Sequence, residues 1–134
     1  MEQIKGTLNR VELIGWVGAE PEQRFTSTGT AVCSFRVATK RFAGRNEAGE
    51  RTVETDWTTA ETWDKLAETC GRYLHKGSRV RVIGSLHTRS WEDRESGQKR
   101  FRTVVKADEV LFLGARPEQE SEPAEVAETE DIPF

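Results

Sequence analysis

The chain has little cysteine and little histidine. Its 134 residues include two cysteines, Cys33 and Cys70, and two histidines, His75 and His87. Two cysteines are too few for a disulfide framework, so we expect free thiols in a reducing compartment. Cys70, His75 and His87 match no common zinc-ligand spacing, and two histidines suggest no Ser/His/Asp or Cys/His catalytic set. We therefore expect no metal, no cofactor and no catalysis.

Long apolar runs are also missing. No stretch of about 18 apolar residues occurs, so the sequence predicts no membrane-spanning helix and no membrane partner. The first six residues lack the charged and then apolar order of an export signal. We expect a cytoplasmic protein. The length allows one domain with a core of roughly 100 residues, plus a tail.

Positive charge is scarce over the whole chain, because the formal net charge is −3. The charges are segregated, however. Residues 115–134 hold seven acids and one base, and removing them from totals of 23 acids and 20 bases leaves 16 acids and 19 bases in residues 1–114. The sequence therefore predicts a folded body over 1–114 with a net charge of +3, and a disordered acidic tail over 115–134.

The body consists mainly of short segments with the period-two alternation of β-strands. We predict strands over 4–18, around 24–26, and over 31–42, 52–63, 78–91 and 100–113. One short helix is predicted from an N-cap at Asp64 to His75, with Gly77 placed to end it. Its apolar stripe contains Leu66, Cys70, Tyr73 and Leu74. An all-β chain of five main strands, with one helix between the third and fourth, has the order of an OB-fold barrel.

Alternation divides the predicted strands into two faces. The apolar face suits a core and contains Cys33, Phe35, Val37, Val80, Val82, Leu86, Phe101 and Val105. The opposite face interleaves cations with aromatic rings and contains Arg36, Lys40, Phe42, Arg79, Arg81, Arg89, Trp91, Arg100, Arg102 and Lys106. Unpaired bases stack on aromatic rings for about 1 to 3 kcal/mol each, while cations follow the phosphates. The pattern predicts single-strand binding that tolerates any sequence and weakens with salt.

The strand over 52–63 has two interpretations. By hydrophobicity Trp57 and Trp63 would lie inside, because the opposite face, Thr58, Ala60 and Thr62, is a poor core surface. Glu61 shares the tryptophan face, and burying a carboxylate with no obvious partner would cost several kcal/mol. We therefore expect the tryptophan face to be open to water or ligand. For Trp16 a base platform, a subunit contact and a core position all stay open.

Several segments together point to a family. In chain order they are Leu8-Asn9-Arg10-Val11-Glu12-Leu13-Ile14-Gly15, Pro21, Arg24-Phe25, Asp56-Trp57, Lys65-Leu66-Ala67-Glu68, Leu74-His75-Lys76-Gly77-Ser78, Gly84-Ser85-Leu86 and Arg89-Ser90-Trp91. In order and spacing they resemble the bacterial single-stranded DNA-binding proteins over residues 4–113. The final four residues, Asp131, Ile132, Pro133 and Phe134, resemble that family's C-terminal tip.

The resemblance implies a homotetramer, associated with the nucleoid, that binds single-stranded DNA and recruits replication, recombination and repair proteins through the tip. By position, the base-stacking aromatics of the family match Phe42, Trp57, Trp63 and Trp91, and places of phosphate contact match Arg10 and the arginines of 78–91. Glu61 falls where the family usually has an apolar residue, and a carboxylate there would repel phosphate.

One alternative is an OB-fold paralogue that binds RNA, an oligosaccharide, or single strands in a narrower role, because it could use the same stacking face. The terminal residues Asp131–Phe134 disfavour this alternative.

At the tip, the ring of Phe134 would fill an apolar pocket of a partner protein. A basic residue of that partner would bind the α-carboxylate of Phe134.

Overall fold

The computed structural model describes residues 4–115, so the predicted acidic tail from 116 onward and the tip Asp131–Phe134 lie outside the described residues. Within that range the chain forms six strands and one helix. In order they are β1 (Val11–Val17), β2 (Glu22–Phe25), β3 (Ala31–Arg45), β4 (Arg51–Trp63), α1 (Asp64–Tyr73), β5 (Ser78–Glu92) and β6 (Lys99–Ala115).

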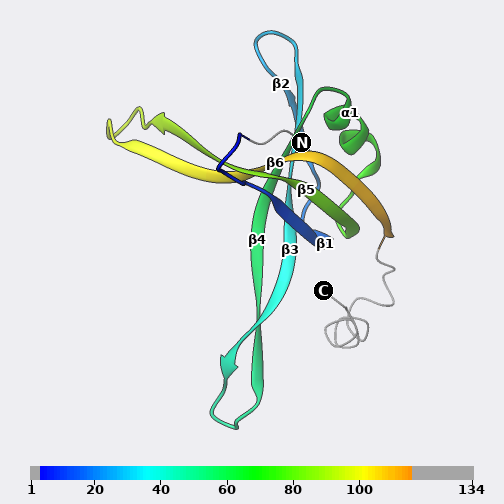
Figure 1. Cartoon of the computed structure of the whole chain (residues 1–134), viewed down its shortest axis with the longest axis vertical. Coiled ribbons are helices and arrows are strands. Elements are labelled where there is room, and N and C mark those ends of the chain that lie inside the picture. The colour runs from blue at the N-terminus through cyan, green and yellow to red at the C-terminus, as the bar shows by residue number, and fades with distance from the viewer. Residues whose placement is uncertain (1–3, 116–134) are drawn as a thin grey trace.

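Five of these strands close into a barrel (Figure 1). The strand order is β1-β5-β6-β4-β3, and a short β1–β3 pairing closes the ring. The β4–β6 pairing is parallel and the other pairings are antiparallel. The short β2 pairs with β3 outside this ring. The structure confirms the predicted all-β fold with one helix, a five-stranded OB-fold barrel.

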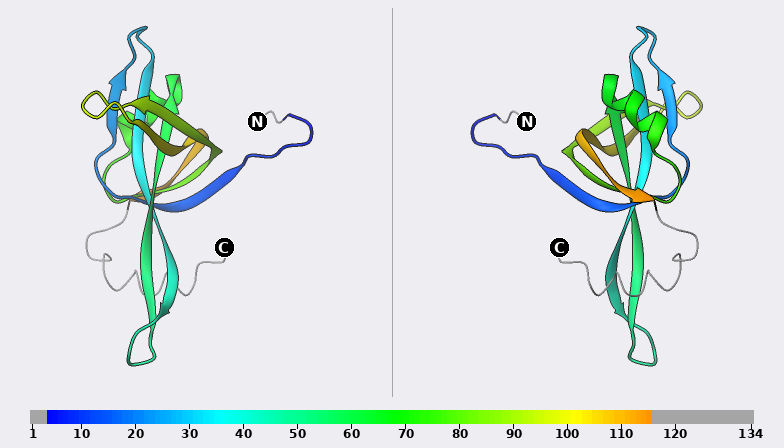
Figure 2. Two further views of the ribbon diagram at one scale, coloured as in Figure 1. Left: turned by 90° about the vertical axis from the view of Figure 1, so that its left-hand side faces the viewer. Right: turned by 90° about the vertical axis from the view of Figure 1, so that its right-hand side faces the viewer.

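Two hairpins continue beyond the barrel as arms. The β3–β4 arm, residues 39–56, runs downward in Figure 1, and the β5–β6 arm, residues 88–103, runs to the left. Figure 2 shows the β3–β4 arm leaving the barrel in both side views. Each strand of the arms is slightly longer than predicted, because the backbone ladders continue into the polar turns that we assigned to loops. The arms extend the strand surface well past the core.

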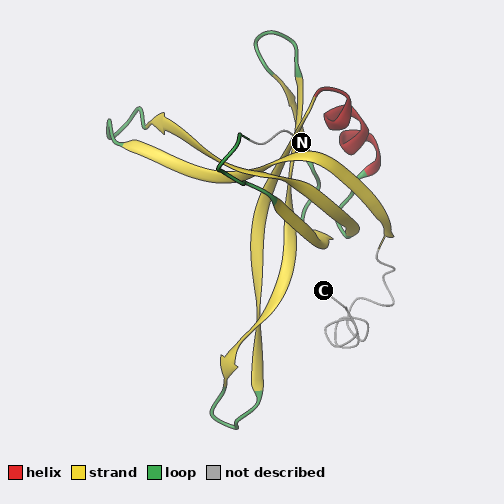
Figure 3. Ribbon diagram, viewed as in Figure 1, coloured by secondary structure: helices red, strands yellow, loops and turns green. Residues whose placement is uncertain are grey.

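The core fills the barrel interior and continues against α1. Figure 3 shows this helix, in red, beside the strands of the barrel. Its buried members confirm most of the predicted apolar face and include Val17, Cys33, Phe35, Val37, Ala60, Ala67, Cys70, Leu74, Val80, Val82 and Val105. On the weakly apolar inner face of β4, Ala60 and Thr62 are also buried, and Thr58 is half-buried. There the hydroxyl of Thr62 donates a hydrogen bond of 2.9 Å to the backbone oxygen of Cys33, so this buried polar group is satisfied.

Leu86 and Phe101 do not belong to the core, contrary to prediction. Both side chains are exposed. Phe101 lies on the β5–β6 arm and Leu86 lies just before it, so alternation continues along both strands while these two side chains stay uncovered. Alternation marks a face of a strand, and only the neighbouring elements decide whether that face is buried.

The predicted start of the first strand is wrong, because β1 begins at Val11. Just before it, the side chain of Asn9 donates to the backbone oxygen of Leu86 and accepts from its N–H, each at 2.8 Å. A side-chain amide therefore holds this segment against β5 in place of a backbone ladder.

The helix prediction needs three corrections. Asp64 is the first helical residue, with φ of 57°, and the cap position is Trp63, without a side-chain cap hydrogen bond. The reason is that β4 runs directly into α1. The helix ends at Tyr73, before His75, and Gly77 uses its positive φ in the following turn, where its N–H bonds Val17. Tyr73 is exposed beside the ring of Phe112, outside the buried stripe.

Candidate nucleic-acid interface

An open hollow of about 460 Å³ lies where β2, β4, β5 and β6 come together. It is lined by Arg24, Glu61, Trp63, Arg89, Trp91 and Arg102. Four of these are predicted site residues, which the fold brings together from three strands. Arg24 is an additional one, which sequence reasoning missed because an exposed arginine on a four-residue strand has no periodic signal. The hollow combines two indole rings with three guanidinium groups and one carboxylate.

Glu61 is buried in this hollow and has a partner. Its side chain is 10% exposed, and its Oε1 accepts a hydrogen bond of 2.7 Å from Nη2 of Arg89. The expectation of a carboxylate without a partner is therefore wrong, because the partner comes from β5, 28 residues along the chain. A charge-assisted hydrogen bond of this kind offsets part of the desolvation cost of the carboxylate.

Two cations lie near the ring of Trp63. The guanidinium carbon of Arg89 lies 5.9 Å from the ring centroid and the ammonium nitrogen of Lys106 lies 5.7 Å from it. Each such contact contributes about 0.5 to 1 kcal/mol at an exposed site. The indole N–H of Trp63 is buried and has no hydrogen-bond partner within residues 4–115. Trp63 is thus half-buried, and only part of its ring is open to the hollow.

Trp57 lies further along the same face of β4 and is 48% exposed. The guanidinium carbon of Arg36 lies 4.7 Å from its ring centroid. The ring rests against Gly18, where an added Cβ would stand 2.0 Å from Cζ3 of the indole. Gly18 is therefore a second residue that sequence reasoning missed, although a glycine next to the end of a strand is a signal for close approach. The expected open tryptophan face is confirmed for Trp57.

Arg102 connects the β5–β6 arm to this face, since its Nη2 donates a hydrogen bond of 3.1 Å to the hydroxyl of Thr59. Trp91 is 49% exposed near the arm's tip, across the ladder from Arg100. Arg100 bonds the carboxylate of Asp93 at 3.3 Å. Hydrogen bonds from the backbone N–H of Glu95, then from that of Ser96 and from the side chain of Arg100, lower the pKa of Asp93. The contacts with Glu95 and Arg100 also hold the turn of this arm. Trp91 and Arg102 are thus presented on an ordered hairpin.

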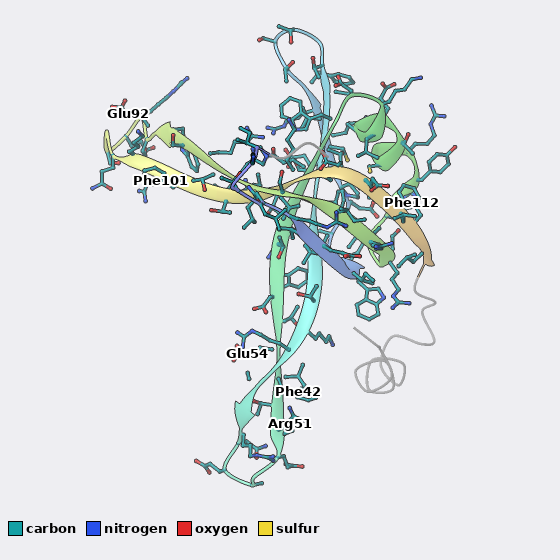
Figure 4. All side chains as sticks on the ribbon, in the orientation of Figure 1. Phe42, Arg51, Glu54, Glu92, Phe101 and Phe112 are labelled. Atoms are coloured by element: carbon teal, nitrogen blue, oxygen red, sulfur yellow. The ribbon has the colours of Figure 1, made fainter. Side chains whose placement is uncertain are left out.

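Phe42 lies on the β3–β4 arm, apart from the hollow (Figure 4). Its ring is 46% exposed, and the guanidinium carbon of Arg51 lies 3.6 Å from the ring centroid. Lys40 is exposed on the same arm, across from Thr55. The arm therefore carries an aromatic ring and cations in a second place.

Five predicted arginines do not line the hollow. Arg36 lies beside Trp57 and Arg100 lies on the β5–β6 arm, while the other three lie elsewhere. Arg79 and Arg81 lie on the half of β5 that pairs with β1. There Arg81 donates a hydrogen bond of 2.6 Å to Glu12, and the guanidinium carbon of Arg79 lies 5.8 Å from the ring centroid of Trp16. Arg10 is exposed just before β1. Trp16 itself is half-buried, which excludes a core position for it.

The two cysteines are buried free thiols, as expected. Burial, with a smaller effect of Cys33, raises the pKa of Cys70 to about 11, and burial also raises the pKa of Cys33. A thiol with so high a pKa is a poor nucleophile at neutral pH.

Residues 4–115 contain no cluster of three or more His, Cys, Asp or Glu side chains suited to a metal ion. Within the same residues, no helix is long and apolar enough to span a membrane.

Comparison with known proteins agrees with this geometry. Residues 8–113 match the profile of the Single-strand binding protein family. The chain is 38% identical to single-stranded DNA-binding protein 1 of Chlorobaculum tepidum, over 81% of this chain and 67% of that one. It is 35% identical to single-stranded DNA-binding protein 1 of Nostoc sp., over 85% and 90%.

Among solved structures, the chain resembles the Plasmodium falciparum SSB in complex with ssDNA, with 33% identity and a TM-score of 0.70. The similarity covers 83% of this chain and 99% of that chain. The chain belongs to the single-strand binding protein family.

Proposed function

We propose that this protein binds single-stranded DNA with little regard to sequence. The observation that supports it most is the row of accessible tryptophan rings, Trp57, Trp63 and Trp91, with Arg36, Arg89 or Lys106 within 6 Å of the first two. A relative of the same family, 33% identical, has been solved with ssDNA. The family's name denotes binding, which agrees with the expectation that the chain is not an enzyme.

The proposed mechanism is stacking with electrostatic support. Bases stack on the rings of Trp57 and Trp91 and on the open part of Trp63, each for about 1 to 3 kcal/mol. Arg24, Arg102 and Lys106 neutralise phosphates. Because Arg89 is bonded to Glu61, it supports the Trp63 ring more than it supplies free positive charge.

A competition titration tests the proposal. Tryptophan fluorescence is followed while poly(dT), poly(U) and duplex DNA are added separately to the full chain. We expect strong quenching by poly(dT), and an affinity that falls with salt with a slope of about −0.7 per phosphate neutralised. Equal or tighter binding of RNA or duplex would favour the alternative of an RNA-binding OB-fold paralogue and overturn the assignment.

The biological role is a further part of the proposal. We assign the protein to DNA replication, recombination and repair, acting as a cytoplasmic, nucleoid-associated homotetramer. Asp131, Ile132, Pro133 and Phe134 recruit partner proteins, because an apolar ring next to acidic charge suits a basic-rimmed apolar pocket.

Deletion of residues 131–134 should abolish capture of partner enzymes and leave DNA binding intact. Removal of 115–134 should raise DNA affinity at low salt, because the acidic segment competes for the basic face. Normal partner capture by the truncated chain would refute the docking role. Size-exclusion chromatography with light scattering tests the tetramer.

A further inference from the structure

Glu61 places an accepting oxygen in the hollow next to a stacking ring. Nine-tenths of its side chain is buried, yet it lines the hollow. Its Oε1 is bonded to Arg89, while Oε2 forms no hydrogen bond with any residue of the described part of the chain. A carboxylate is an acceptor only, so Oε2 is suited to a ligand group that donates. The pair with Arg89 fixes the carboxylate in one position and leaves this second oxygen available.

The position of Glu61 relative to Trp63 matches the edge of a stacked base. The two residues are two apart on β4, so their side chains leave the same face of the strand about 7 Å apart. A pyrimidine stacked on the open part of Trp63 would bring one edge of its ring toward Glu61. Trp91 lines the same hollow, so a second ring would stand near a base held there.

The chemistry of the base edges then sets a preference. The exocyclic amino group of cytosine donates hydrogen bonds, and Glu and Asp side chains accept from it. Uracil and thymine carry an oxygen at that position, which would face the carboxylate as one acceptor against another. We propose that Glu61 is a specificity-determining residue that accepts a hydrogen bond from the amino group of the base on Trp63 and favours cytosine over uracil or thymine.

This inference rests on the proposed function, and it adds a composition preference to otherwise sequence-tolerant binding. A hydrogen bond to a charged group changes affinity by about tenfold. Since one base per chain occupies this position, the preference for short oligonucleotides should be of that size.

The test compares short oligo(dC) and oligo(dU) of equal length on the full-length protein. Neither has the methyl group of thymine, so they differ at position 4 of the pyrimidine and in the proton at N3. Wild-type protein should bind oligo(dC) about tenfold more tightly. Glu61→Gln keeps the shape of the side chain but can donate to the oxygen of uracil, so the preference should disappear or reverse. Glu92→Gln, an exposed acid at the end of β5, is the matched control and should leave the preference unchanged.

A second comparison separates direct contact from an effect through Arg89. In an Arg89→Lys background, which keeps a cation to pair with Glu61, Glu61→Gln should still shift the ratio of the two affinities. If the shift occurs only with arginine at position 89, Glu61 merely positions that guanidinium and the inference is wrong.

A further measurement uses only the wild-type protein, so it does not depend on whether a variant folds. Oligonucleotides of N4,N4-dimethyl-deoxycytidine have no amino hydrogen and should lose the preference for cytosine. Equal wild-type affinities for oligo(dC) and oligo(dU) would overturn the inference while leaving DNA binding itself intact. Failure to bind either oligonucleotide would instead refute the proposed function.

Discussion

The two halves of β5 contain the same kinds of residues in different surroundings. In the half that pairs with β1, Arg81 bonds Glu12 and Arg79 lies over Trp16. In the half that enters the β5–β6 arm, Arg89 and Trp91 line the hollow with Arg102. All four β5 residues share one strand parity. We infer from this difference that residues of one strand parity meet nucleic acid, or do not, according to what the neighbouring strands place beside them.

The largest expected effect is the loss of a stacking ring on the arm half. Trp91→Ala should weaken binding of single-stranded DNA by about 1 to 3 kcal/mol. Trp16→Ala, on the barrel half, is the control and should change the DNA affinity by less than about a third of that. Fluorescence anisotropy of a labelled oligonucleotide measures both. If the two variants lose equal affinity, the contrast between the halves of β5 is wrong.

The next effect concerns the close contact of Trp57 with Gly18. Gly18→Ala places a Cβ where the indole now lies, so the ring has to move. Stacking at this position should then be lost, at a cost of up to about 1 to 3 kcal/mol in DNA affinity. In a Trp57→Ala background the same substitution should have little additional effect. Full additivity of the two losses would show that Gly18 acts by another route.

A smaller effect distinguishes the arginines by their salt dependence. Arg102→Gln should reduce the slope of log affinity against log salt by about 0.7, the value for one phosphate contact on a single strand. Arg81→Gln should leave the slope unchanged, because its guanidinium is bonded to Glu12. Titrations at several salt concentrations give both slopes. A reduced slope for Arg81→Gln would place the barrel half in the interface as well.

The smallest effect on DNA binding is expected from the barrel core, where the prediction concerns the stability of the fold. Burial raises the pKa of Cys70 from 9.0 to about 11. Between these values the unfolded chain releases the thiol proton while the folded chain keeps it. The free energy of unfolding should therefore fall by about 2 kcal/mol as the pH rises from 9 to 11. Urea denaturation across this range measures it, and Cys70→Ala should show a shallower decline. Identical declines would show that Cys70 does not titrate in this way.

Much of the fold was predictable from local pattern. Alternation located β3, β4, β5 and β6 to within a few residues and identified the buried faces around Cys33 and Val80. The start of β1 and the first turn of α1 were not predictable from local rules. Asn9 bonds a residue 77 positions away, and Trp63 takes the cap position because β4 continues straight into α1.

The candidate site divides in the same way. Strand parity selected Trp63, Arg89, Trp91 and Arg102, which the fold does bring together. Parity could not distinguish these from Arg79 and Arg81, and it gave no reason to include Arg24 or Gly18. Whether each of these residues belongs to the site depends on which strands are neighbours in the folded chain. The spacing of residues within one strand does not specify its neighbours.

The sequence by itself determined the strand faces, the segregation of charge along the chain and the types of side chain available for stacking. It did so because these properties follow from residue identity and from the two-residue period of a strand. Only the tertiary structure decided that Glu61 is buried and hydrogen-bonded to Arg89, that the ring of Trp57 contacts Gly18, and that half of β5 pairs with β1. Each of these depends on contacts between segments that are far apart in the sequence. The residue types and spacing within one segment do not specify which other segment it will contact.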